Sequence, residues 1–209
     1  MKKDKLQRNY GAFNLDMPKI GDLMLVKHQN KGLTKGYFGR KIKQYQKSQG
    51  FSESDSSWTH VELLLGGPNS VRIQPPRNIV LDGNQHPTMP EFYKGKTVRI
   101  IRFNCPDWNY KRYRVAIWYA CKANLKYDKL GILRFYLDGL VDHSESQFFC
   151  SEGAIDSLRR EYPLLCPVLR TSLDPHEFLP ADFSLKNWSY QTDKKRFIDL
   201  ETIFEGVLT

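Results

Sequence analysis

The stretch that decides the fold reads Gln147-Phe148-Phe149-Cys150-Ser151-Glu152-Gly153-Ala154-Ile155. It places Cys150 at the junction between an apolar run and a helix that we expect to continue to Arg160. A thiol at a helix N-terminus lies at the positive end of the helix dipole, which lowers its pKa and favours the reactive thiolate. Ser151 and Glu152 are residue types that suit a first helical turn. The stretch therefore predicts a cysteine nucleophile at the start of a helix.

A cysteine nucleophile needs a general base, and the best candidate lies far upstream. His60 opens an apolar strand, expected over 59–65, that ends at the turn Gly66-Gly67. A strand over 71–74 follows this turn, so the two strands read as a hairpin. A histidine on a strand and a cysteine at a helix start can form a nucleophile–base pair. The sequence therefore predicts that His60 and Cys150 lie side by side.

The composition indicates one globular domain over residues 1–209. Hydrophobic residues make up 40% of the 209 residues and aromatic residues 13%, which is enough for a substantial core. The net charge of +9 favours contact with an anionic surface such as nucleic acid, a wall polymer or phospholipid headgroups. The basic residues are spread along the chain, however, and no nucleic-acid-binding motif accompanies them, so nucleic-acid binding is the weaker hypothesis.

The four cysteines, at positions 105, 121, 150 and 166, show no C-x-x-C spacing. They therefore suggest neither a structural zinc site nor a redox pair, and we expect no metal and no organic cofactor. The basic N-terminus is not followed by an apolar run, so neither a signal peptide nor a transmembrane segment is visible. We accordingly expect a cytoplasmic protein whose cysteines are reduced thiols.

The remaining chain divides into short elements around these two motifs. Residues 1–17 read as a polar lead-in and residues 27–57 as a polar insertion or loop region, within which 36–49 could form a helix. Strands are expected at 23–26, 97–103 and 188–190. Residues 77–95 read as mostly loop. A helix is expected over 108–125 with Tyr113, Ile117, Ala120 and Cys121 on one side, and Asp174-Pro175 indicates a short capped helix.

Five short blocks occur in one order: Gly21-Asp22-Leu23-Met24-Leu25, Thr59-His60-Val61-Glu62, Tyr127-Asp128 with Gly131-Ile132-Leu133, Phe149-Cys150-Ser151-Glu152, and Asp174-Pro175-His176-Glu177-Phe178. This ordered set, spanning roughly residues 18–180, resembles the circularly permuted NlpC-type papain-like amidases and peptidases, the YaeF/YiiX-like family. The resemblance implies an α+β fold in which an antiparallel sheet packs against helices, including the one that starts at the nucleophile. It also implies Cys150 as nucleophile, His60 as base, and a third polar residue on the strand after the histidine.

The third residue should orient the imidazole, and the expected return strand offers Arg72 and Gln74. Arginine carries only donors, whereas the glutamine carbonyl can accept the imidazole N–H, so Gln74 is our prediction. Glu62 is the alternative, because it lies two residues from His60 and hence on the same strand face. A neutral third group would stabilise the imidazolium less than a carboxylate would.

The implied activity is that of a cysteine hydrolase, an amidase or thiol protease or an acyl-ester hydrolase, working through an acyl-enzyme. The Cys150 backbone N–H is the expected oxyanion donor. The substrate would be a peptide, a peptidoglycan-like amide or a lipid acyl group, and peripheral contact with anionic surfaces suits the charge. Two alternatives stay open: a catalytically impaired binding module on the same fold and a basic nucleic-acid-binding protein.

Overall fold

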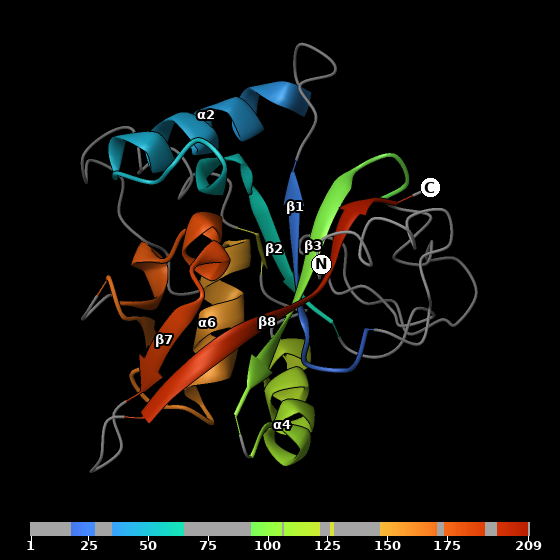
Figure 1. The fold of residues 1–209 in the computed structure, drawn as a ribbon, viewed down its shortest axis with the longest axis vertical. Coiled ribbons are helices and arrows are strands. Elements are labelled where there is room, and N and C mark those ends of the chain that lie inside the picture. The colour runs from blue at the N-terminus through green and yellow to red at the C-terminus, as the bar shows by residue number, and fades with distance from the viewer. Residues whose placement is uncertain are drawn as a thin grey trace, which may run out of the picture.

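The computed structural model describes residues 18–27, 35–64, 93–105, 107–121, 126–127, 147–170, 174–190 and 196–208. Within these ranges the fold is mixed α/β, with a six-stranded antiparallel sheet in the order β2-β1-β3-β8-β7-β6. Figure 1 shows α2 at one end of the strands, α4 at the other, and α6 beside the sheet. The bounds of the sheet strands are β1 Leu23–Lys27, β2 His60–Leu63, β3 Thr97–Asn104, β6 Cys166–Pro167, β7 Asn187–Tyr190 and β8 Arg196–Val207.

The helices and the short elements complete the chain. The helices are α2 Lys35–Ser48, α4 Trp108–Cys121 and α6 Cys150–Arg159, and the short 3-10 helices are η1 Asp55–Ser57, η3 Pro175–Glu177 and η4 Pro180–Ser184. Two residues of β4, Lys126–Tyr127, pair in parallel with two of β5, Gln147–Phe148. The paired residues end at Phe148, two residues before the start of α6 at Cys150, so the pairing helps to fix where that helix begins.

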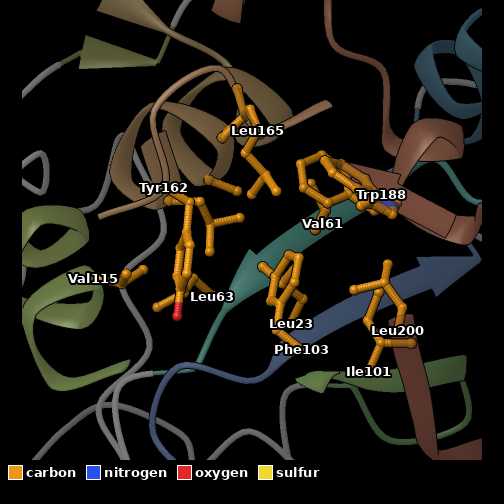
Figure 2. Close-up of a cluster of buried hydrophobic side chains, with 14 of the residues drawn as sticks. Leu23, Val61, Leu63, Ile101, Phe103, Val115, Tyr162, Leu165, Trp188 and Leu200 are labelled. Atoms are coloured by element: carbon orange, nitrogen blue, oxygen red, sulfur yellow. The ribbon is translucent and has the colours of Figure 1, made fainter. Parts of the chain in front are cut away.

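The sheet buries both of its faces because its strands alternate between two apolar clusters. Side chains of adjacent strand residues point to opposite faces. On one face, Leu23, Leu25, Val61 and Leu63 belong to the larger cluster, which α4 and α6 cover. In Figure 2, Val115 of α4 and Tyr162, just beyond α6, meet the strand side chains of this cluster. The opposite face carries a smaller cluster made of Met24, Val26, Leu64, Tyr93, Val98, Ile100, Phe204 and Leu208.

Most of the expected elements are confirmed in type and approximate position. The strands expected at 23–26, 59–65, 97–103 and 188–190 are β1, β2, β3 and β7, and the helices expected at 36–49 and 108–125 are α2 and α4, the latter described to Cys121. The capped turn at Asp174 is the 3-10 helix η3, in which Glu177 Oε2 accepts a hydrogen bond from the Asp174 N–H at 2.7 Å. The region 27–57 is not loop alone, since it contains both α2 and η1.

Two expectations need correction. The buried side of α4 is formed by Trp108, Val115, Ala116 and Tyr119, whereas Tyr113 and Ile117, which were expected to share a side with Ala120, are exposed. The outer side of α4 is itself rich in aromatic and aliphatic residues, so hydrophobic spacing alone could not identify the inner side. The long strand β8, which pairs with β3 between Asp199 and Val207, was not predicted either.

Several expectations fall outside the described residues: the lead-in 1–17, the return strand 71–74 with Gln74, and the block at 128–133. Among the residues that are described, no helix is long and apolar enough to cross a membrane.

Candidate active site

Cys150 is the first residue of α6, as the sequence predicts. The residue before it, Phe149, has an extended backbone with φ −109° and ψ 170°, and its carbonyl accepts the Gly153 N–H at 3.0 Å to close the first turn. Glu152 Oε2 accepts the Phe149 N–H at 3.4 Å. The hydroxyl of the buried Ser151 donates to the Phe178 carbonyl at 2.6 Å, which anchors this turn to the segment after η3. The thiol is therefore held at the N-terminal end of a well-anchored helix, where the helix dipole favours its anionic form.

His60 begins β2, and Glu62 lies two residues further along the same strand. Their backbones pair with β1, with His60 opposite Val26 and Glu62 opposite Met24. Because strand side chains alternate, the imidazole and the carboxylate share one face. His60 Nε2 lies 3.0 Å from Glu62 Oε1. Helix α6 packs against β2, and the side chain of Cys150 hydrogen-bonds to that of His60.

The three side chains form a buried, charged chain. The exposed fractions are 5% for Cys150, 6% for His60 and 3% for Glu62. Burial on its own would lower the pKa of His60, but the charge on Cys150 and hydrogen bonds to Cys150 and Glu62 outweigh it and raise that pKa to about 10. At neutral pH the imidazole is therefore protonated and lies between two acidic groups. A histidine in this state pairs with a thiolate, which is the nucleophilic form of cysteine.

The segment that leads into His60 is fixed by the fully buried side chain of Gln46 in α2. Its amide nitrogen donates to the Ser56 carbonyl at 2.8 Å and to the Trp58 carbonyl at 2.9 Å, and its amide oxygen accepts the Ala181 N–H at 2.9 Å. One amide group thus joins α2, the approach to β2 and η4. Sequence reasoning missed this residue, because nothing distinguishes Gln46 from the other polar residues of α2.

A second residue that sequence reasoning missed is Tyr93. Its hydroxyl donates to Glu62 Oε1 at 2.5 Å, so the same carboxylate oxygen interacts with both Tyr93 and His60. Tyr93 is completely buried. It lies in the stretch 77–95 that was expected to be mostly loop, and no local pattern marks it as part of a site.

The structure thus brings together Cys150, His60 and Glu62, while Gln74, the predicted third residue, lies outside the described residues. The other thiols have different surroundings. Cys105 lies 3.0 Å from the Tyr162 hydroxyl, and burial raises the pKa of its thiol. Cys166 is buried in the larger cluster, and nothing is described of the Cys121 side chain. Within the described ranges no group of three or more His, Cys, Asp and Glu side chains is arranged to hold a metal ion.

The site is therefore defined by its geometry alone. No family model matches the chain, and no curated protein and no solved structure gives a significant match.

Proposed function

We propose that this protein is a cysteine hydrolase with a permuted papain-like arrangement, in which the histidine strand precedes the cysteine helix. The observation that carries the proposal is the position of His60, which is buried and hydrogen-bonded to both Cys150 and Glu62. Nucleophile, base and orienting group in one contiguous chain are what covalent catalysis by a weakly acidic thiol requires. A histidine with only a structural role needs one such partner, not an acidic group on each side.

In the proposed reaction, the Cys150 thiolate attacks the carbonyl carbon of an amide, ester or thioester. The tetrahedral intermediate collapses, the leaving group takes the proton from the His60 imidazolium, and the acyl group remains on Cys150. The neutral imidazole then removes a proton from water, which attacks the acyl-enzyme and releases the carboxylic acid and the thiolate. His60 Nε2 faces Glu62, which leaves Nδ1 as the nitrogen that exchanges protons with the sulfur and the leaving group.

We assign the third role to Glu62 rather than to Gln74. A carboxylate stabilises an imidazolium by charge as well as by a hydrogen bond, and it fixes the tautomer by accepting from one ring nitrogen. The contact of 3.0 Å between His60 Nε2 and Glu62 Oε1 supports this assignment. A charged third group also favours an active enzyme over an impaired binding module.

The first N–H groups of a helix have no acceptor within the helix and point toward its N-terminal end. We therefore propose the Cys150 N–H as an oxyanion donor, with no metal or organic cofactor. The substrates would be peptide, peptidoglycan-like or lipid acyl groups, and the compartment would be one in which thiols remain reduced. Nucleic-acid binding is the weaker alternative: the charge of +9 and the alternation of aromatic and basic residues over 108–114 suit it, but the basic residues are spread along the chain.

The deciding experiment compares the alkylation rates of the four thiols by iodoacetamide between pH 5 and pH 10, read by mass spectrometry. Cys150 should label fastest at neutral pH, and its rate should already be near its maximum below the usual thiol pKa of about 8.5. Cys166 is the matched reference for access, because its exposed fraction of 5% equals that of Cys150.

Two variants complete this experiment. His60→Ala should slow the labelling of Cys150 and leave that of Cys105 unchanged. If Cys105 or Cys166 labels faster than Cys150 in the wild type, the nucleophile is assigned wrongly and the hydrolase proposal fails.

A further inference from the structure

The Glu62 carboxylate is held by a second buried group besides His60. Tyr93 donates its hydroxyl to Glu62 Oε1 at 2.5 Å, and His60 Nε2 lies 3.0 Å from the same oxygen. Tyr93 has an exposed fraction of 0% and Glu62 of 3%. A buried carboxylate needs hydrogen-bond donors, and a donor that carries no charge leaves the negative charge of the carboxylate available to the imidazolium.

The ring of Tyr93 is held in place by contacts other than its hydrogen bond to Glu62. It packs in the smaller cluster with Val98 and Leu208, and Lys96 Nζ lies 5.1 Å from the ring centroid. The turn behind the ring is closed by a hydrogen bond from the Lys96 N–H to the Tyr93 carbonyl at 2.9 Å. The hydroxyl therefore approaches Glu62 from a fixed direction.

The same turn is attached to the end of β8. Gly95, with φ +76°, donates its N–H to the Leu208 carbonyl at 2.6 Å, and the Leu208 N–H donates to the Lys96 carbonyl at 3.0 Å. A positive φ is readily adopted by glycine, so Gly95 lets the chain turn tightly here. The position of Tyr93 thus depends on three elements: β2 through Glu62, β3 through the turn that precedes it, and β8 through Leu208.

We propose that Tyr93 is a positioning residue of the active site, whose hydroxyl fixes the Glu62 carboxylate so that one of its oxygens stays on His60. In this scheme Tyr93 acts through its hydrogen bond to Glu62 and makes no contact with the substrate. Without the hydroxyl, the carboxylate can rotate about its terminal torsion, and its mean attraction for the imidazolium weakens. This inference rests on the hydrolase proposal for its functional meaning, but its test reads the protonation of His60 directly.

The test is Tyr93→Phe, which keeps the ring and removes the hydroxyl. The His60 imidazole is titrated by NMR in protein with isotope-labelled histidine, and its signal among the five histidines is identified with His60→Ala. The midpoint for His60 should fall by about one pH unit, the lower end of the about 1–3 units that a nearby opposite charge contributes, because the carboxylate remains but is no longer held against the imidazole. Tyr162→Phe is the matched control, because it removes another buried hydroxyl, one bonded to Cys105 Sγ at 3.0 Å, and should leave the midpoint unchanged.

A double-mutant cycle separates positioning from a merely structural effect. If Tyr93 acts through Glu62, then Tyr93→Phe added to Glu62→Gln should shift the midpoint no further. An unchanged or raised midpoint in the single variant, or an equal fall in the Glu62→Gln background, overturns the inference.

A measurement on the wild type keeps the test valid even if a variant fails to fold. The Tyr93 hydroxyl proton, in a 2.5 Å bond to a buried carboxylate, should give a slowly exchanging downfield resonance, and its absence would contradict the proposed hydrogen bond. The two proposals fail separately. Activated Cys150 labelling together with an unmoved Tyr93→Phe midpoint rejects only the positioning role, whereas an inert Cys150 rejects the hydrolase.

Discussion

Replacing Glu62 by Gln tests the interaction between Cys150, His60 and Glu62 most directly, because it removes one charge and keeps the size of the side chain. The pKa of His60 is about 10 in the folded protein. At 3.0 Å and an effective dielectric constant of about 20, two unit charges attract by about 5 kcal/mol, an upper limit on what the pair can contribute. Opposite charges at such distances shift a pKa by about 1–3 units in practice. We therefore expect Glu62→Gln to lower the pKa of His60 by about 2 units, to about 8.

The three variants Glu62→Gln, Cys150→Ser and their combination should lower the pKa of His60 to different extents. The Cys150 charge raises the pKa of His60 more than Glu62 does, so Cys150→Ser should lower it further than Glu62→Gln. In the double variant burial is the dominant remaining influence, and the pKa should fall below the ordinary histidine value of about 6.5. NMR titration of the labelled imidazole measures all three.

The stability of the folded protein should also depend on the protonation of His60. Because folding raises the pKa of His60 from 6.5 to about 10, its contribution to the free energy of unfolding is complete below pH 6.5 and is lost as the pH rises through about 10. The stability difference between the wild type and Glu62→Gln, from urea denaturation, should therefore shrink at alkaline pH. Glu205→Gln, which breaks a 2.8 Å pair with Arg99 elsewhere on the sheet, is the control. The reasoning would be refuted if Glu62→Gln lowered the pKa of His60 by less than about half a unit, or if Glu205→Gln lowered that pKa equally.

Two further predictions concern the scaffold. Gln46→Leu should lower the free energy of unfolding by about 2–4 kcal/mol, because it leaves three buried backbone groups without the amide they contact. Urea denaturation measures this change. The control is Gln44→Leu, which replaces an exposed side chain of the same helix and should leave the free energy of unfolding almost unchanged. Burial raises the pKa of Asp182 from 3.8 to about 6, so the folded state favours its protonated form, and this residue's contribution should make the protein more stable as the pH falls from about 6 to about 4. The difference in unfolding free energy between the wild type and Asp182→Asn, measured across this range, isolates that contribution; a difference that does not depend on pH would contradict it.

Cys150 and His60 could be predicted from the sequence, because the pattern of neighbouring residues marks each of them. A cysteine between an apolar run and a helical pattern, and a histidine opening an apolar strand, are visible within a few residues. Glu62 was recognised only as an alternative, on the alternation of strand side chains. The preference for Gln74 came from the expected hairpin partner, and a sequence contains no distance with which to rank the two.

Residues that act from a distance could not be predicted. Tyr93 reaches Glu62 across 31 positions, and Gln46 reaches Ala181 across 135, so no periodicity joins them. The strand β8 was missed although it pairs with β3 along eight residues of that strand. The inner side of α4 was misassigned because the helix carries large apolar residues on both sides, and only the packed sheet determines which of them are buried.

The attachment of the Tyr93 turn to Leu208 affects the order in which contacts form while the chain is being synthesised. Tyr93 is synthesised well before Leu208, yet the turn that carries it is held by hydrogen bonds to Leu208, just beyond strand β8. Strand pairing between segments this far apart forms late, because loop closure must be completed before the contacts can stabilise it. On the ribosome, the Tyr93 hydroxyl should therefore reach Glu62 only after β8 has joined the sheet.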